Sequence, residues 1–460
     1  MPTLSSRLAD WAIGFSLEDA PPDIVHSTKL HLLDLVGVML ASTRHRTVEA
    51  AARAQQDADG GGRGAFALWG PAETSLAGAA FLNGVASAVL EFDDTHIASN
   101  IHPTGVILAA ILAEAQRAPA SGRHLLEALI TGSEILCRLG LVSPVRMHEV
   151  GFHPTSVYGV FAATYAVARM RGLSAEAMTH AVGTAASLSA GSISAFQDGA
   201  DSKTLHVGFA ASAAMRAVAL AQQGLSGPSA VFEGPFGWYR SHVQSGVDFR
   251  FDALTDGLGR DWALRDIAPK LYPCAYTLMP FIAAALALRQ RETFALEDIV
   301  EIRCQIMRRS FRTVCEPVAD KRRPRTSWHG RISLQHTVAE ALALGRFDKS
   351  AYDETSLRDP LINRLADRVV HVPDPVADAD TTRSRAVVTL IFADGRQREQ
   401  VVEDMVGTRR NPAPDSLYLD KFNANVAGIL PPDRADMLRQ SLMRIEQIAD
   451  VDAHLSELRS

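Results

Sequence analysis

The amino-acid sequence predicts a mainly helical protein in which a large all-helical domain carries a smaller α/β domain inserted late in the chain. Two observations lead to this fold class. Apolar residues recur at three- and four-residue steps over most of the first 225 residues and again over 417–458, as they do in helices. Between these regions, apolar and polar residues alternate in short stretches that are typical of half-buried strands. We therefore assign residues 1–268 and 405–460 to the helical domain and residues 269–404 to the α/β domain.

Helical segments are expected throughout the first half of the chain. Apolar side chains repeat at helical spacing in residues 24–37, 106–115, 125–139, 157–170 and 210–223. Many of the intervening residues are alanine or glycine, so these helices are expected to pack closely on one another. Pro103 and Pro154 mark the turns that open two of them.

The pattern changes after about Pro269. Strands are expected at residues 299–306, 369–372, 385–392 and 396–402. The last two flank Asp394-Gly395, which is the signature of a β-hairpin turn. A helix is expected between the first two strands, at residues 333–344.

Composition and charge exclude several classes of function. The 460 residues include 46 Lys and Arg against 52 Asp and Glu, a net charge of −6, so we expect no nucleic acid and no anionic membrane surface among the partners. The four cysteines form no C-x-x-C pair, which argues against a disulfide scaffold or a thiolate zinc site and fits a reducing compartment. Arg7 and Asp10 interrupt the N-terminal segment where a secretory signal needs an apolar stretch. No run reaches the roughly 18 apolar residues of a membrane helix, so we expect a cytoplasmic protein.

Common catalytic signatures are missing. The sequence contains no P-loop, no H-E-x-x-H and no dinucleotide-binding fingerprint. The glycine-rich run at residues 60–64 lacks a strand–turn–helix setting, so we interpret it as a loop.

Four polar islands stand inside apolar sequence, and the first is the densest. It contains three carboxylates and two imidazoles, namely Glu91, Asp93, Asp94, His96 and His102. Burying such groups is costly unless they are paired, so they are expected to line a cleft or to cap helix ends. Capping is an equal alternative for Asp94, whereas His102 precedes a helix N-terminus that would attract an anionic substrate. A metal site built from Asp93, His96 and His102 is a further alternative.

The second and third islands repeat this arrangement. His153 stands in a His-Pro turn before an apolar helix, where an imidazole can act as acid, base or carboxylate ligand, or simply cap the helix. Lys203 and His206 precede a helix rich in alanine and valine. Such a lysine can hold a carboxylate or donate a proton, and the alternative is a solvated surface lysine.

The fourth island lies at the domain boundary, which is a favoured place for a site. Lys270 and Tyr272 are its candidate site residues. Cys274 would be a nucleophile only with an activating partner, and the sequence shows none.

Taken together, the islands FDDTH…HPTG, GFHPTSVYG, DGADSKTLHVGFAA and PKLYPCAYT resemble the MmgE/PrpD family. LLDLVGVMLA (32–41), AAFLNGVA (79–86), GLSGPSAVFEGPFG (224–237) and GTRRNPAPDSLYLDKFNANV (407–426) extend the resemblance over nearly the whole chain. The family includes 2-methylcitrate dehydratase, cis-aconitate decarboxylase and iminodisuccinate epimerase. The resemblance implies a helical domain with an α/β lid, a homodimer, no metal or organic cofactor, and small di- or tricarboxylates bound between the domains.

Carried over residue by residue, the decarboxylase pattern implies site roles for Thr95, His102, His153, Lys203 and Lys270. Its catalytic acidic residue falls on Glu91, where the decarboxylase has Asp. A second departure is the absence of a histidine shortly after the Tyr-Pro of the fourth island, where Tyr276 is a candidate substitute. Arg331 and His336 lie in a stretch that resembles the family's Ser-Leu segment, which implies contacts from the lid.

We therefore predict a cofactor-independent lyase, a dehydratase or a decarboxylase, acting on a small polycarboxylate. In the dehydratase form, His102 or His153 is predicted to remove a proton α to a carboxylate, and the other histidine to hold or protonate the departing hydroxyl. Glu91 or Asp93 orients an imidazole. Substrate contacts are predicted for Thr95, Lys203, Lys270, Tyr272, Tyr276 and Arg331. The alternatives are an epimerase or isomerase of a small dicarboxylate and a non-catalytic carboxylate-binding homologue.

Overall fold

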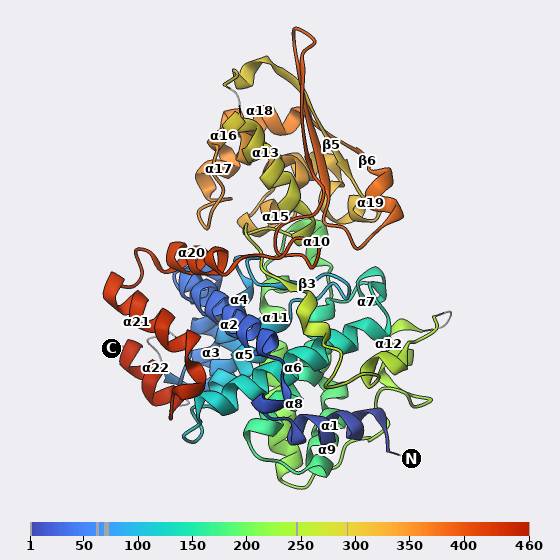
Figure 1. Ribbon diagram of the computed structural model, residues 1–460, viewed down its shortest axis with the longest axis vertical. Coiled ribbons are helices and arrows are strands. Elements are labelled where there is room, and N and C mark those ends of the chain that lie inside the picture. The colour runs from blue at the N-terminus through green and yellow to red at the C-terminus, as the bar shows by residue number, and fades with distance from the viewer. Residues whose placement is uncertain (1, 61–63, 69–72, 245–246, 292, 460) are drawn as a thin grey trace.

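The computed structural model describes residues 2–60, 64–68, 73–244, 247–291 and 293–459 (Figure 1). The fold is mainly helical, as the sequence predicts, with small sheets confined to short regions. One apolar core draws its residues from between Leu8 and Ile267 and between Phe422 and Leu455. A second core draws on residues between Cys274 and Met405. Residues 61–63 of the glycine-rich run predicted as a loop lie outside the described residues.

The large domain is built from long helices that pack side by side. Its principal helices are α2 (Pro22–Ser42), α4 (Leu76–Ala88), α5 (Pro103–Glu114), α6 (Gly122–Val142), α8 (Pro154–Met170) and α11 (Ser202–Gln222). The remaining helices are α1 (Leu4–Gly14), α3 (Arg46–Asp59), α7 (Arg146–Glu149), α9 (Ala175–Ala185), α10 (Ala195–Asp198) and α12 (Trp238–Val243). Strand β1 (Ala65–Phe66) pairs antiparallel with β2 (Glu73–Thr74). The helices predicted at 24–37, 106–115, 125–139, 157–170 and 210–223 are thus confirmed, with the last one starting eight residues earlier.

Glycines let two of these helices approach closely. A Cβ atom added to Gly84 of α4 would lie 2.6 Å from the Cα of Gly208 on α11, so neither position has room for a side chain. This contact brings the segment that follows α4, with Glu91, next to the start of α11, with Lys203.

Helices α2 and α11 each span 21 residues and are long and apolar enough to cross a membrane by length and composition alone. Most of each helix is buried inside the protein, as core helices are. The sequence had shown no uninterrupted run of that length, because polar residues interrupt both helices.

The C-terminal segment returns to the large domain. Helices α20 (Asp415–Val426) and α21 (Pro432–Met443) pack against α2, and α22 (Val451–Arg459) adds Val451 and Leu455 to the same core, so the two ends of the chain contribute to one domain (Figure 1). Phe422 of α20 packs against Gly37 of α2, where an added Cβ would come within 3.0 Å of its ring.

The small domain contains a four-stranded sheet in the order β6-β5-β7-β8. Strand β5 (Ile299–Ile306) pairs in parallel with β6 (Val369–Pro373) and antiparallel with β7 (Ala386–Phe392), which pairs antiparallel with β8 (Gln397–Val402). The hairpin predicted at Asp394-Gly395 is confirmed, with Gly395 at φ +86°. The domain's helices are α13 (Met279–Arg291), α14 (Val318–Arg322), α15 (Ser327–Arg331), α16 (Leu334–Leu344), α17 (Glu354–Arg358), α18 (Pro360–Arg368) and α19 (Pro375–Ala379).

A two-stranded ribbon joins the first and fourth polar islands where the domains meet. Strand β3 (Thr95–His96) pairs antiparallel with β4 (Ile267–Ala268), with Thr95 opposite Ala268. Residues that are 170 positions or more apart in the sequence are thereby held side by side. A second bridge is made by α10 of the large domain, whose Phe196 packs edge-on against Trp328 of α15, with ring centroids 5.2 Å apart.

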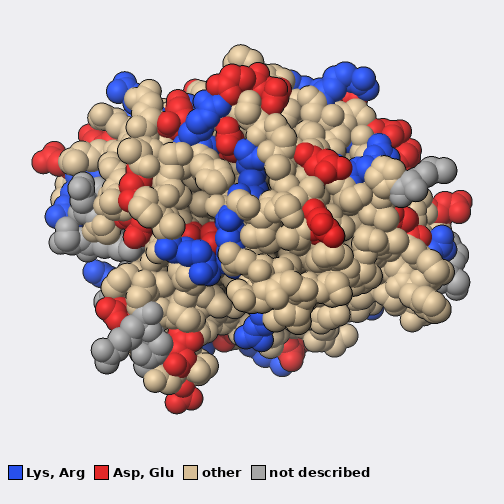
Figure 2. Space-filling view, turned by 90° about the horizontal axis from the view of Figure 1, so that it is seen from below, with Lys and Arg blue, Asp and Glu red and all other residues tan. Residues whose placement is uncertain are grey.

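The surface is mixed in charge. Figure 2 shows, on the face seen from below, acidic and basic side chains interspersed among uncharged residues.

Candidate active site

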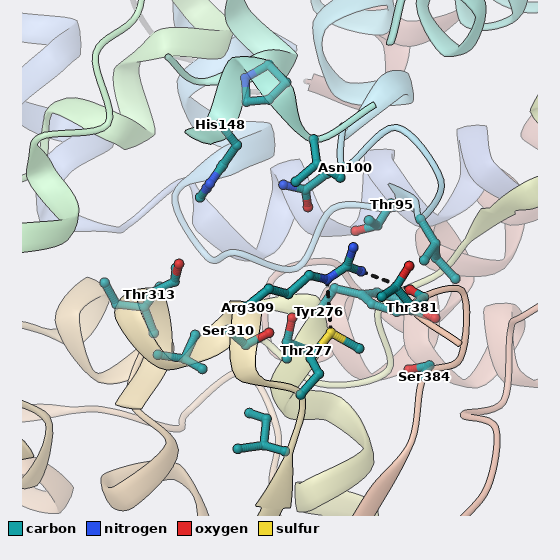
Figure 3. Close-up of a pocket in the computed structure, with 18 of the residues that line it drawn as sticks. Thr95, Asn100, His148, Tyr276, Thr277, Arg309, Ser310, Thr313, Thr381 and Ser384 are labelled. Atoms are coloured by element: carbon teal, nitrogen blue, oxygen red, sulfur yellow. Dashed lines mark hydrogen bonds between the residues drawn. The ribbon is translucent and has the colours of Figure 1, made fainter. Parts of the chain in front are cut away.

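A cavity of about 200 Å³ lies between the two domains. This is smaller than the roughly 300–1,000 Å³ of pockets for drug-sized ligands, so the cavity suits a small metabolite. Its polar lining from the large domain consists of Glu91, Thr95, Asn100, His102, His148, Glu149, His153 and Lys203. The small domain contributes Tyr276, Thr277, Arg309, Ser310, Thr313, Thr381, Arg383, Ser384 and Arg385 (Figure 3).

Three helices of the large domain begin at the cavity wall. His102 is the N-cap of α5, His153 is the N-cap of α8, and Lys203 lies in the first turn of α11. Helix N-termini carry a partial positive charge and unpaired backbone N–H groups, so they attract anions. This convergence explains why three of the polar islands stand immediately before apolar helices.

Glu91 connects two lysines that come from distant parts of the chain. The residue is buried, with a left-handed backbone at φ +51°. One carboxylate oxygen accepts a hydrogen bond from Lys203 Nζ, and the other lies 3.0 Å from Lys270 Nζ. Burial alone would raise the pKa of Glu91, but the two ammonium groups outweigh it and hold the pKa well below its ordinary value. Glu91 is therefore a carboxylate at neutral pH.

Lys270 and Asp93 lie directly behind Glu91 and do not line the cavity. Lys270 Nζ is fully buried and lies 3.3 Å from Asp93 Oδ1 as well as 3.0 Å from Glu91 Oε1. Burial lowers its pKa, and the two carboxylates raise it further than burial lowers it. The ammonium predicted to hold a substrate carboxylate is thus occupied by carboxylates of the protein itself.

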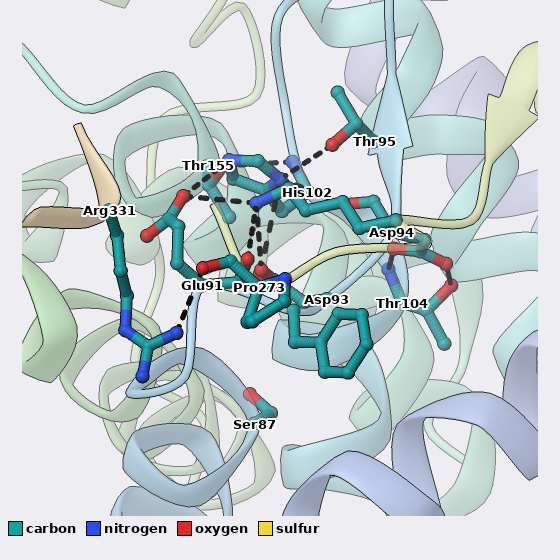
Figure 4. Close-up of polar contacts among 12 residues, drawn as sticks. Ser87, Glu91, Asp93, Asp94, Thr95, His102, Thr104, Thr155, Pro273 and Arg331 are labelled. Atoms are coloured by element: carbon teal, nitrogen blue, oxygen red, sulfur yellow. Dashed lines mark hydrogen bonds and ion pairs between the residues drawn. The ribbon is translucent and has the colours of Figure 1, made fainter. Parts of the chain in front are cut away.

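His102 presents one ring nitrogen to the cavity and the other to the protein. Its Nδ1 lies 2.8 Å from the carbonyl oxygen of Asp94 and 3.1 Å from Thr95 Oγ1, while Nε2 lies 3.8 Å from Glu91 Oε1 (Figure 4). A carbonyl oxygen only accepts hydrogen bonds, so Nδ1 carries the proton and Nε2 keeps its lone pair in the neutral ring. Burial lowers the pKa of His102, against the opposing effect of Asp93, which favours that neutral form.

The Asp94 side chain braces this arrangement. Its carboxylate accepts hydrogen bonds from the backbone N–H and the hydroxyl of Thr104 in the first turn of α5, and it lies 3.0 Å from Nδ1 of His31. It does not line the cavity, which agrees with the capping alternative.

His153 lines the cavity and contacts His206, which does not line it. Their Nδ1 atoms are 3.3 Å apart, and the buried Nε2 of His153 has no hydrogen-bond partner among the described residues. Burial and the charge of Lys203 hold the pKa of His153 well below its ordinary value and lower that of His206 to about 4. The ring of His153 lies 6.3 Å from that of His102, close enough for both to contact one small substrate.

Two of the predicted substrate contacts point away from the cavity. The ring of Tyr272 packs edge-on against Phe347 in the small-domain core, 6.1 Å between centroids. Arg331 is buried, donates a hydrogen bond to the carbonyl oxygen of Pro273 at 2.8 Å, and stacks over Tyr352. Both side chains pack inside the small domain and do not line the cavity. This placement does not agree with the substrate contacts predicted for Tyr272 and Arg331.

Tyr276 does line the cavity, on the side of the small domain. Its hydroxyl is buried without a hydrogen-bond partner among the described residues, and burial raises its pKa. The hydroxyl is therefore protonated at neutral pH and able to donate to a bound molecule.

Sequence reasoning missed His148 and Arg309. His148 lies on α7 and lines the cavity, with its pKa lowered to about 4 by burial and by the charge of Lys203. Its position five residues before His153 was the available signal. Arg309 follows strand β5 in a run of basic residues, which resembles an ordinary solvated surface until the domains are brought together.

Within the described ranges, no group of three or more His, Cys, Asp or Glu side chains is placed to hold a metal ion. Of the three residues that the metal alternative would need, His96 turns its Nδ1 to Ser99 Oγ at 2.6 Å, away from His102.

Comparisons with known proteins agree over most of the chain. Family models of the MmgE/PrpD N-terminal domain and of the MmgE/PrpD C-terminal domain match residues 6–250 and 272–447. A cis-aconitate decarboxylase-like protein of Aspergillus oryzae is 26% identical over 98% of this chain and 96% of its own length. Cis-aconitate decarboxylase of Mus musculus is 27% identical over 81% of this chain and 76% of its own. 2-Methylcitrate dehydratase of Escherichia coli O157:H7 is 28% identical over 77% of this chain and 76% of its own length.

Proposed function

Because the chain belongs to the MmgE/PrpD family, we propose that this lyase is cofactor-independent and acts on a small di- or tricarboxylic acid, by dehydration or decarboxylation. Relatives named for both reactions support the proposal. 2-Methylcitrate and cis-aconitate, which their names contain, are the first substrates to test. The observation that carries the proposal is the geometry of His102, a neutral imidazole whose Nε2 faces a cavity built to attract anions.

In the dehydratase form, His102 Nε2 takes the proton from the carbon α to a carboxylate. The electron pair of that C–H bond forms the carbon–carbon double bond. The hydroxyl on the neighbouring carbon departs and takes the proton from His102, so that water leaves and the neutral imidazole is restored. His153 holds the departing hydroxyl, because its own Nε2 is unpartnered and its ring is 6.3 Å from His102. The carboxylate next to the reacting carbon gains negative charge as the proton leaves, and Lys203 with the three helix N-termini stabilises that charge.

In the decarboxylase form, the bond to one carboxylate breaks and carbon dioxide leaves. The electron pair stays on carbon and is delocalised toward the remaining carboxylate at Lys203. The carbon then accepts a proton from the hydroxyl of Tyr276, which lines the cavity, and the tyrosine regains its proton from water after the product leaves. Both reactions thus need the same stabilisation of a carbanion, and the cavity offers one set of groups for it.

A proton NMR time course in deuterated buffer tests the proposal. The panel is 2-methylcitrate, citrate, cis-aconitate, malate and iminodisuccinate. New olefinic signals, or loss of a carboxyl carbon, would establish the lyase and name its substrate. Exchange of an α-proton with the skeleton intact would instead favour the epimerase, and saturable binding without conversion would favour the non-catalytic homologue.

We propose a homodimer on the strength of the sequence resemblance, and a cytoplasmic location on the strength of the scattered cysteines, which fit a reducing compartment. Light scattering behind a sizing column tests the oligomeric state.

A further inference from the structure

One cation on the cavity wall, Arg309, forms no ion pair with the described residues. The charge of Glu149 acts on it, but Glu149 is itself paired with Arg146. The charged residues that line the cavity, all within the described part of the chain, are Glu91, Glu149, Lys203, Arg309, Arg383 and Arg385. Five of them are paired: Lys203 with Glu91, Arg383 and Arg385 with Glu403, and Glu149 with Arg146 at 2.8 Å. Among the described residues, no carboxylate pairs with Arg309.

The Arg309 side chain is nevertheless held in place. Its Nε donates to Met307 Sδ at 3.0 Å, and one terminal nitrogen donates to the carbonyl oxygen of Thr381 at 2.9 Å. Figure 3 shows the side chain extended into the cavity with its guanidinium on the side of Thr95 and Thr381. The remaining N–H groups make no hydrogen bond to the described residues, and the residue is exposed, so a solute in the cavity can reach them.

The other charged groups around the cavity are paired with one another, so Arg309 is available to bind an anion. Lys203 and Lys270 face Glu91 and Asp93, so two ammonium groups are already matched by two carboxylates. A substrate with a single carboxylate would find the helix N-termini and Lys203 on the large-domain wall. A second carboxylate on the same molecule would meet the unpaired guanidinium on the opposite wall.

We propose that Arg309 binds a second substrate carboxylate from the small domain, opposite His102 and Lys203, and thereby selects acids that carry two or more carboxylates. This inference rests on the proposed function, because it assigns a further contact in the same cavity. A guanidinium presents a planar fork of N–H donors that matches a carboxylate, which makes it more selective than an ammonium group. Ser310 and Thr313 also line the cavity from the small domain.

The neighbouring Arg308 provides a matched control. It stands one residue earlier, is 72% exposed, and lies 3.4 Å from Asp378 instead of in the cavity. If only surface charge mattered, replacing either arginine would weaken binding of a polycarboxylate equally. If the cavity contact matters, only replacement of Arg309 would weaken it.

The test is calorimetric binding of tricarballylate, an unreactive tricarboxylate, and of the monocarboxylate isobutyrate to the wild-type protein, Arg309→Gln and Arg308→Gln. We expect Arg309→Gln to weaken tricarballylate binding about tenfold or more, as for loss of a charge-assisted hydrogen bond. Isobutyrate binding should stay unchanged, and Arg308→Gln should bind both as the wild type does. On the acid that the wild type converts, the KM of Arg309→Gln should rise more than its kcat falls.

Equal tricarballylate binding by the wild type and Arg309→Gln would overturn the inference, as would equal losses in the two arginine variants. The lyase proposal fails on a different result. A wild type that binds tricarballylate through Arg309 but converts none of the acid panel would support the inference and contradict the lyase. A wild type that converts an acid with the same KM as Arg309→Gln would overturn only the inference.

Discussion

The Nδ1 atom of His102 lies 2.8 Å from the carbonyl oxygen of Asp94. That oxygen belongs to the backbone, so no change of pH can turn it into a donor. The contact fixes both the orientation of the ring and its tautomer, and it leaves Nε2 as the basic atom at the cavity. Asp94 in turn is held by Thr104 of α5, so the start of this helix positions the base.

The first prediction concerns the pH dependence of kcat/KM. Burial lowers the pKa of His102 from the ordinary value of about 6.5, so the neutral base persists to lower pH than in an exposed histidine. The acid limb of kcat/KM, corrected for ionisation of the substrate, should therefore have an apparent pKa below about 6.5. The variant His26→Gln, at an exposed site paired with Asp415, should give the same profile. An acid limb at or above pH 7 would contradict this assignment.

The second prediction concerns stability at the buried charge cluster. Glu91→Gln leaves Lys203 and Lys270 without their shared counter-charge, and breaking a buried ion pair on one side costs about 3–5 kcal/mol. Urea denaturation followed by circular dichroism should show a loss of that order. Glu354→Gln, which removes the exposed partner of Arg358, should leave the unfolding midpoint unchanged. An equally stable Glu91→Gln protein would show that the cluster is not maintained as described.

The third prediction separates function from stability at Tyr276. Its buried hydroxyl has no partner in the described part of the protein, so Tyr276→Phe should not lower the thermal midpoint, while kcat/KM should fall about tenfold. Tyr239→Phe is the opposite case. The Tyr239 hydroxyl donates to the carbonyl oxygen of Leu139 at 2.6 Å, so its removal should destabilise the fold by about 1–3 kcal/mol and spare kcat/KM. Unchanged kcat/KM in Tyr276→Phe would remove this hydroxyl from the site.

The fourth prediction concerns stability against pH. Burial lowers the pKa of His96 and of His206 to about 4 in the folded protein, compared with about 6.5 in an unfolded chain. Below pH 6.5 the unfolded state therefore binds more protons than the folded state, so the free energy of unfolding falls as the pH falls toward 4. Calorimetry between pH 7.5 and 5 should show a steadily decreasing midpoint. A midpoint that is flat or rises in this range would contradict the neutral, buried state of these rings.

Much of the site follows from sequence because helix starts are local features. His102, His153 and Lys203 each stand before or within the first turn of an apolar helix, and a polar group buried there needs a partner or a ligand. The hairpin at Asp394-Gly395 is local in the same way.

The remaining features depend on which way a side chain turns once the domains meet. Tyr272 and Arg331 lie in stretches without regular periodicity, where spacing does not determine side-chain direction, and both turn into the small-domain core. Lys270 is brought beside Asp93 only by the pairing of β3 with β4. Arg309 becomes a cavity residue only because the end of β5 faces the large domain.

The role of His102 as the base is tested by comparing the wild type with His102→Gln in the NMR time course, on the acid that the wild type converts. Removal of a general base costs about 10²–10⁴ in rate, so His102→Gln should convert that acid at least a hundredfold more slowly with an unchanged circular dichroism spectrum. Conversion by folded His102→Gln at the wild-type rate would show that His102 is not the base.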